Sequence, residues 1–262
     1  MQSATDHSAG APAAPLLSLR AITKAYGAVE ALKGVDIDVH VGEVLAICGD
    51  NGAGKSSLIR IISGAQEPTG GTVALRGEPT RLRSPQDALQ RGVATIYQDL
   101  ALAPRLSIAQ NVFLGSELTR SVPGLRFARL LDKRRMAEEA RGYLQRLAID
   151  ISDMSIPVES LSSGQRQAVA IGRALRWNAE LIIMDEPTAA LGVKETAQVL
   201  DLVRRLRVEG RTVILISHNM ADVVSVATRV VILKNGRKVA ETSTENLDAD
   251  TLAHMVMTGR RP

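Results

Sequence analysis

The sequence predicts an α/β fold in which helices cover a largely parallel sheet on both faces. Short apolar runs alternate with stretches of helical periodicity along most of the chain, which is typical of this architecture. The run Val44–Cys48 is apolar throughout, as expected of a strand buried on both faces. A glycine-rich turn and a predicted helix over residues 55–63 follow this strand directly.

The composition excludes several classes of protein. The chain has 262 residues and is 45% hydrophobic, which excludes a disordered chain. A net charge of +4 and a content of 2 Phe, 1 Trp and 3 Tyr do not favour nucleic acid as a partner. Cys48 is the only cysteine, so we exclude a disulfide scaffold and interpret it as a small core residue. No apolar run approaches the ~20 residues that span a bilayer.

The N-terminal part begins with a segment of low complexity and continues with short strands. Residues 1–15 are rich in Ala, Ser and Pro and predict a disordered tail without a secretory signal. Residues 35–39 alternate Val and Ile with Asp, which is the period of a half-buried strand. Ser84 and Pro85 predict the N-cap and first turn of a short helix. Further strands are expected at residues 16–22, 72–75 and 93–97.

Helix-forming residues replace the apolar strand runs from about residue 104 to residue 157, which predicts a helical insertion. Within it, Asp132 opens a helix expected over residues 133–147. Strand–helix alternation then returns, with helices at 162–176 and 193–209, strands at 181–185 and 212–217, a hairpin of 230–233 with 238–240, and a helical segment after Ser243.

Residues 49–56 fit the phosphate-binding pattern G-x-x-x-x-G-K-[ST]. Its glycines let successive backbone N–H groups curl around a polyphosphate, and the helix that follows adds a positive dipole. Lys55 is expected to reach the β- and γ-phosphates, and Ser56 to ligate Mg²⁺. The alternative, a glycine-rich turn with a chance lysine, is disfavoured by the flanking strand and helix. The predicted nucleotide-binding residues here are Gly49, Asp50, Asn51, Gly52, Ala53, Gly54, Lys55, Ser56 and Ser57.

A second motif ends the predicted strand 181–185. Four apolar residues are followed by Asp185 and Glu186, at the end of the strand where α/β sheets bind ligands. Asp185 is suited to hold Mg²⁺, and Glu186 to polarise an attacking water. An apolar strand that ends in Asp-Glu is also a common start of a loop, so the phosphate loop decides in favour of nucleoside triphosphate hydrolysis.

Further features lie in a consistent order around these motifs. Gln98 and His218 each end a predicted strand, Tyr26 follows the first strand, and residues 161–165 read Leu-Ser-Ser-Gly-Gln. With these residues, the sequence over residues 16–240 closely resembles the ATP-binding subunits of ABC transporters. Taken singly, the same residues have structural alternatives: a helix cap for residues 161–165, polar strand ends for Gln98 and His218, and core packing for Tyr26.

The resemblance implies roles for these residues. Tyr26 stacks on adenine, Gln98 contacts Mg²⁺ and water, and His218 contacts the γ-phosphate, so that Glu186, His218 and Lys55 form the catalytic set. Mg²⁺ is held by Ser56, Gln98 and Asp185. The signature residues act on the ATP of a partner subunit in a head-to-tail homodimer; they are Ser162, Ser163, Gly164 and Gln165.

The resemblance also implies a fold and its limits. We expect a P-loop nucleoside triphosphatase core with an N-terminal antiparallel β subdomain, and a helical subdomain at about residues 100–176 that carries the signature. The cassette then spans residues 16–258 and is followed by a tail, residues 259–262. Two residues depart from the family pattern: Ser163 stands where glycine is usual, and Gly192 replaces an aspartate that normally contacts the opposite subunit.

Within the family, residues 111–115 and 216–220 resemble the monosaccharide-uptake branch, here in a single-cassette form. This resemblance implies integral-membrane permease subunits as partners, an extracytoplasmic solute-binding protein, and a location on the cytoplasmic face of the membrane. The permease is expected to dock where residues 100–106 present Leu100, Leu102, Pro104 and Leu106. The alternatives are an ABC-type ATPase acting on nucleic acid or ribosomes, and a regulator that binds ATP without hydrolysing it, which Gly192 motivates.

Overall fold

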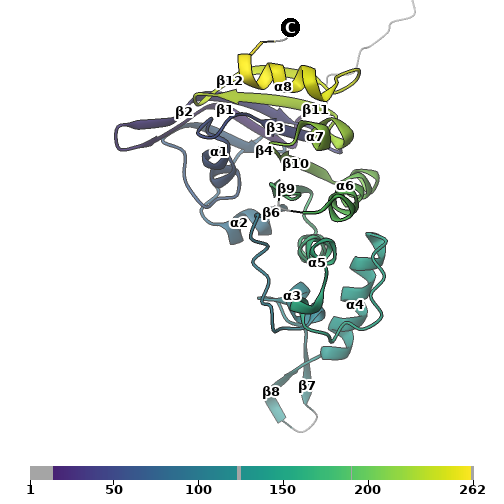
Figure 1. The fold of residues 1–262 in the computed structure, drawn as a ribbon. Helices are drawn as coiled ribbons and strands as arrows, with labels where there is room; N and C mark the ends of the chain where they lie inside the picture. Colours follow the sequence, from purple (N-terminus) through teal and green to yellow (C-terminus); the bar gives the residue numbers. More distant parts are fainter. Residues whose placement is uncertain (1–13, 123–124, 190, 261–262) are drawn as a thin grey trace, which may run out of the picture.

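The computed structural model describes residues 14–122, 125–189 and 191–260 (Figure 1). Residues 1–13 of the predicted N-terminal tail and residues 261–262 of the predicted C-terminal tail lie outside the described residues. Among the helices that the structure describes, none is both long enough and apolar enough to cross a membrane.

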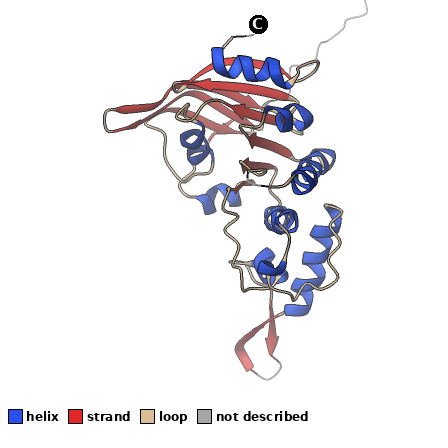
Figure 2. Cartoon of the chain, in the orientation of Figure 1, coloured by secondary structure: helices blue, strands red, loops and turns tan. Residues whose placement is uncertain are grey.

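A six-stranded sheet in the order β12-β11-β3-β10-β9-β6 forms the centre of the fold (Figure 2). The strands from β11 to β6 run parallel to their neighbours, and β12 joins the edge antiparallel. The predicted α/β class with a mostly parallel sheet is therefore confirmed. The strands are β3 (Val44–Cys48), β6 (Val93–Ile96), β9 (Leu181–Asp185), β10 (Thr212–Ile216), β11 (Arg229–Lys234) and β12 (Arg237–Ser243).

A second sheet is antiparallel, in the order β2-β1-β4-β5, and confirms the expected antiparallel subdomain. Helix α1 shares a core with both sheets: Leu58 and Ile61 of α1 pack in one cluster with Ile47 of β3 and Leu19 of β1. The phosphate-loop helix is thus fixed by burial of its apolar face. The strands are β1 (Leu17–Tyr26), β2 (Val29–Val39), β4 (Gly70–Leu75) and β5 (Glu78–Pro79), so β1 and β2 extend beyond their predicted limits.

The other helices contribute to a second core on the opposite face of the central sheet or lie near it (Figure 1). They are α2 (Pro85–Gln90), α3 (Ile108–Phe113), α4 (Lys133–Arg146), the 3₁₀ turn η1 (Val158–Ser160), α5 (Ser163–Arg176), α6 (Val193–Val208), α7 (Met220–Val226) and α8 (Ala249–Thr258); α1 spans Lys55–Ile62. The predicted caps are present, since the Ser84 side chain accepts from Asp87 N–H and the Asp132 side chain from Arg135 N–H. Helix α7 was not expected, because seven residues are too short for a periodic signal.

The predicted helical insertion also contains two strands that were not expected. An antiparallel hairpin of β7 (Thr119–Val122) and β8 (Leu125–Leu131) lies between α3 and α4 and projects from the molecule (Figure 1). The hairpin residues whose burial the structure describes, such as Arg120, Arg129 and Leu130, are exposed, so they give no alternation of buried and exposed positions that a sequence pattern could reflect. The available sequence signal was the turn-forming dipeptide Pro123-Gly124.

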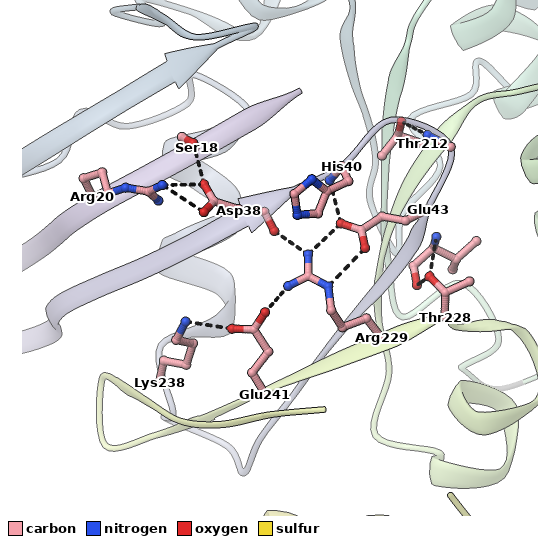
Figure 3. Close-up of polar contacts among 12 residues, drawn as sticks. Ser18, Arg20, Asp38, His40, Glu43, Thr212, Thr228, Arg229, Lys238 and Glu241 are labelled. Carbon is pink, nitrogen blue, oxygen red and sulfur yellow. Dashed lines mark hydrogen bonds and ion pairs between the residues drawn. The ribbon is translucent and has the colours of Figure 1, made fainter. Parts of the chain in front are cut away.

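A polar cluster joins the two sheets at the end of the central sheet where the parallel strands begin (Figure 3). The guanidinium of Arg229, the first residue of β11, donates to Glu43 (Nη2–Oε1 2.7 Å), to the backbone carbonyl of Asp38 on β2 (2.5 Å) and to Glu241 of β12. The side chains of Arg229 and Glu43 are only 18% and 12% exposed. Loss of either partner leaves the other charge poorly solvated and unpaired.

We therefore expect Arg229→Met to lower the free energy of unfolding by about 2–3 kcal/mol, because Glu43 stays buried without a counter-charge. Urea denaturation monitored by circular dichroism measures this loss. Arg20→Met is the matched control, since Arg20 forms an exposed pair with Asp38, worth at most about 1 kcal/mol. Equal losses in the two variants would contradict this account of the cluster.

Candidate functional site

The carboxyl ends of four neighbouring parallel strands meet at one edge of the central sheet. Ile216 of β10 pairs with Ile47 of β3 on one side and with Asp185 of β9 on the other, and β6 pairs with β9. The phosphate loop, His218 and Gln98 follow β3, β10 and β6, so the register brings these segments to the edge that carries Asp185.

The phosphate loop requires glycine at two positions, because neighbouring backbone atoms approach it too closely there to leave room for a side chain. Gly49 and Gly54 have φ angles of +154° and +105°. A Cβ atom on Gly49 would clash with the carbonyl oxygen of Leu233 in β11, and one on Gly54 would lie 2.7 Å from the carbonyl oxygen of Ala31 in β2. Glycine therefore lets the loop curl tightly while it rests against both sheets.

The N-terminus of α1 is open to an anion. The helix has no side-chain cap and no acidic residue in its first turn, so its first amide N–H groups are available. The Lys55 ammonium donates to the carbonyl oxygens of Gly49 (2.6 Å) and Asp50 (3.1 Å). No ion pair among the residues that the structure describes involves Lys55. Exposed residues of the segment are Asp50, Asn51, Gly52 and Ser56; Ser57 is half-buried and Ala53 is buried.

Glu186 and His218 are in direct contact. His218 Nδ1 lies 2.7 Å from Glu186 Oε2. The Glu186 side chain is 19% exposed and that of His218 is 72% exposed, so the carboxylate is shielded while the imidazole faces solvent. Glu186 adopts φ +52°, a strained conformation for a residue other than glycine, and its N–H donates to the carbonyl of Ile216 (2.9 Å). The bond to β10 holds this conformation and aims the carboxylate at His218.

Asp185 is the half-buried carboxylate of the site. Burial raises the pKa of Asp185, the neighbouring Glu186 charge raises it further, and the positive charges of Lys55 and Arg60 partly offset the rise. Within the described ranges no group of three His, Cys, Asp or Glu side chains is placed to enclose a metal ion. One carboxylate with hydroxyl and amide oxygens nearby suits Mg²⁺, which binds few protein ligands and completes its shell with phosphate and water.

Gln98 and the signature line one cavity. It has a volume of about 330 Å³, and its walls include Gln98, Glu186 and Ser163. None of the described residues that line it belongs to the phosphate loop, which lines a separate cavity with His218. Within one chain, the structure thus brings the signature beside Gln98 and Glu186 but not onto the phosphate loop.

The signature forms a helix N-terminus. The Ser162 side chain accepts from Gln165 N–H (3.2 Å), and the Gln165 side chain accepts from Ser162 N–H (3.0 Å), which makes a capping box at the start of α5. The helix-cap interpretation of Ser162 is therefore confirmed in this chain. Ser163 and Gly164 occupy the first two helical positions, and a Cβ on Gly164 would lie 2.6 Å from Gln198 Oε1 of α6.

Tyr26 ends β1 and is 40% exposed, so the core-packing alternative is wrong. Its hydroxyl is hydrogen-bonded to Gln66, and the Lys24 ammonium lies 5.3 Å from the centre of its ring. These contacts hold an exposed aromatic ring in a fixed orientation, as a stacking surface requires.

The sequence predicts the core position of Cys48, but it does not predict the Glu186–His218 contact or the part that α8 has in lining the site. Cys48 is fully buried and burial raises its pKa to about 12, which confirms the core interpretation. The Glu186–His218 contact was not predicted, although both follow adjacent parallel strands. The cavity beside the phosphate loop, about 510 Å³, includes Val256 and Met257 of α8. No local sequence pattern predicts that α8 lines this cavity, because α8 is distant in sequence from the phosphate loop.

The comparison with known families and proteins gives consistent results. The family model described as ABC transporter matches residues 32–189. The fructose import ATP-binding protein of Rhizobium meliloti is 48% identical over 228 residues, which are 86% of this chain and 87% of that protein. The xylose/arabinose import ATP-binding protein of Sulfolobus acidocaldarius is 43% identical over 92% of this chain and 93% of its own length. The ribose import ATP-binding protein of Yersinia pestis is 42% identical over 94% of this chain, which spans 47% of that protein.

Solved structures give the same fold. The ADP conformation of an ATP-binding cassette of an ABC transporter aligns with a TM-score of 0.78 at 26% identity, covering 94% of this chain and 99% of the cassette. A dimeric cassette in a post-hydrolysis state, bound to ADP and phosphate, aligns with a TM-score of 0.70 at 27% identity, covering 87% and 98% of the two chains. The phosphate loop, the shared sheet edge and these matches together show that this chain belongs to the ABC transporter family, as an ATP-binding and ATP-hydrolysing cassette.

Proposed function

We propose that this chain hydrolyses ATP to energise the import of a monosaccharide through partner permease subunits. The observation that carries the proposal is that three relatives, 42–48% identical over nearly the whole of this chain, are each named for the import of a sugar. The sugar itself is selected outside the cassette, so the site supports the class of substrate and not one member of it.

The contacts of the site support a division of catalytic work. Glu186 is the general base that takes a proton from the attacking water, because its carboxylate is shielded and held by backbone and side-chain contacts. His218 orients Glu186 by donating Nδ1–H to the Glu186 carboxylate, and the solvent-facing side of its ring contacts the γ-phosphate. Lys55 moves from the loop carbonyls to the phosphates, where its ammonium stabilises the charge that develops during phosphoryl transfer.

Mg²⁺ fits the donor set of this site. The hydroxyl of Ser56, the amide of Gln98 and the carboxylate of Asp185 supply oxygen ligands. Burial raises the pKa of Asp185, and the charges of Lys55 and Arg60 offset this rise only in part, so a cation at Asp185 would be favourable. When bound, the ion neutralises phosphate charge during the transfer.

A head-to-tail homodimer follows from the separation of the two anion sites. The signature helix of one chain faces a cavity that no described phosphate-loop residue lines, so its remaining N–H groups and the Ser163 hydroxyl serve a nucleotide held by another copy. Gly192 caps α6 without a side chain, and a Cβ there would lie 2.7 Å from Glu195 Oε2. Glu195 therefore supplies the carboxylate nearest to the position where the family has aspartate.

The permease docks beside the Gln98 loop in this proposal and holds the cassette at the cytoplasmic face of the membrane. Leu102 and Leu106 are half-buried, and Leu102 also packs against the core of the helical region. An extracytoplasmic solute-binding protein acts only through the permease. The basic run after residue 203 has other partners within the described residues: Arg205 pairs with Asp201, and Arg211 bonds to Asn178, so this run does not favour the nucleic-acid alternative.

We expect Glu186→Gln to lower kcat by at least about 100-fold, because the amide cannot take a proton from water. Equilibrium ATP binding should persist, since Glu186 does not hold the ground-state phosphates. Phosphate release and nucleotide binding measure the two effects. Glu180→Gln, just before the start of the same strand, is the control and should keep its rate. If Glu186→Gln hydrolyses ATP at an unchanged rate, Glu186 is not the general base.

Charge at the docking surface should uncouple transport from nucleotide binding. In a complex purified with its permease, we expect Leu106→Glu to abolish sugar-stimulated ATPase activity, because a carboxylate cannot enter an apolar interface. ATP binding by the variant should match the wild type. Leu130→Glu is the control, because Leu130 is 53% exposed on the β7–β8 hairpin. If monosaccharides from a panel still stimulate the ATPase activity of Leu106→Glu normally, the permease docks at another surface.

A further inference from the structure

The loop that carries Gln98 has little backbone structure of its own. It runs from the end of β6 to the start of α3, and only Leu106 N–H to Ala103 carbonyl (3.1 Å) closes a backbone turn within its described part. Ala101, three residues after Gln98, adopts φ +49°, which is strained for a residue other than glycine. Contacts beyond the loop's own backbone turns therefore hold this conformation. The Asp99 side chain accepts from Ala101 N–H (3.3 Å), and the N–H of Glu159 donates to the carbonyl of Pro104 (3.0 Å).

Two side chains from the helices α3 and α5 add further contacts. The amide of Asn111, fully buried in α3, bonds to both the N–H (2.7 Å) and the carbonyl (3.0 Å) of Ala103 and so fixes the later part of the loop. Arg173 fixes the part next to Gln98: its Nη2 donates to the carbonyl of Leu100 and its Nη1 to that of Ala101, each at 3.0 Å. The planar guanidinium thus grips two consecutive carbonyl groups.

Arg173 is neither fully exposed to solvent nor paired with a carboxylate, the two usual environments of an arginine side chain. It lies half-buried on α5, burial lowers its pKa, and among the described residues no carboxylate lies within ion-pair distance of it. A methionine or leucine would fill the same volume without the cost of desolvating a charge. The two carbonyl contacts are therefore what the arginine adds.

The position of Arg173 in α5 gives these contacts a consequence for the site. Helix α5 begins with the signature, and Ser163 at its start lines the same cavity as Gln98. Arg173 thus links the loop of Gln98 directly to the helix that begins with the signature, although the two come from separate parts of the chain.

We propose that Arg173 is a positioning residue for Gln98, which it places against the nucleotide by fixing the Leu100 and Ala101 carbonyls to the signature helix. The inference rests on the proposed role of Gln98 at Mg²⁺ and water. Arg173 itself touches neither the nucleotide nor the metal; it acts through the loop.

A double-mutant cycle in the full chain tests this inference. We expect Arg173→Met to lower kcat about tenfold with nucleotide affinity nearly unchanged, because a misplaced Gln98 costs rate more than binding. In the Gln98→Ala background the same substitution should cause no further loss of kcat, since both substitutions remove the same function, the placement of the Gln98 side chain. Arg173→Lys keeps a single charged donor and should recover part of the rate.

Arg176→Met is the matched control. Arg176 lies three residues later in α5, is also half-buried, and donates to the carbonyl of Ser116 (2.7 Å) while its guanidinium lies 4.5 Å from the ring of Phe113. None of its hydrogen bonds within the described residues reaches the Gln98 loop, so its effect on kcat should be the same with and without Gln98→Ala. If Arg173→Met fails to fold, the same cycle is run with Arg173→Lys.

Two results would overturn the inference, and they are distinguishable. If Arg173→Met lowers kcat by the same factor in both backgrounds, as is expected of Arg176→Met, then Arg173 has only a structural role and the proposed function stands. If Gln98→Ala leaves kcat unchanged, the proposed role of Gln98 fails, and the role of Arg173 through it fails as well.

Discussion

The parallel register of β3, β10, β9 and β6 is the constraint on which the rest of this structure depends. It aligns four strand ends, so the phosphate loop, His218, Asp185 with Glu186, and the loop of Gln98 leave the sheet at one edge. Burial maintains the register, because β3 and β10 are buried along their whole length. A one-residue shift in β9 or β10 would separate Glu186 from the carbonyl of Ile216 and from His218.

Around this edge, the molecule fixes its reactive groups by contacts from distant elements. Gly49 and Gly54 lie against β11 and β2, and the left-handed backbone of Glu186 is held by β10. Arg173 holds the Gln98 loop to the helix that begins with the signature. The antiparallel sheet and the helical region therefore do more than enclose the core: each of them positions one side of the proposed nucleotide site.

The sequence predicts most of the sheet and the phosphate loop, because buried strands and glycine-rich turns leave strong local patterns. It does not predict the β7–β8 hairpin, whose described residues are exposed and so lack an alternating pattern. Tyr26, Gln98 and His218 can be picked out only by their order in the chain, and the Glu186–His218 and Arg173 contacts depend on tertiary packing that no local pattern encodes.

The central claim is that each catalytic site is shared between two copies of this chain, and it is tested most directly by mixing two inactive variants. Lys55→Ala disables the phosphate loop, and Ser163→Glu places a carboxylate in the signature; each alone should lack ATPase activity. A dimer with one chain of each kind contains one site with both parts intact, so co-expression should restore phosphate release. If the mixture stays as inactive as its components, the phosphate loop and the signature of different chains do not form one site.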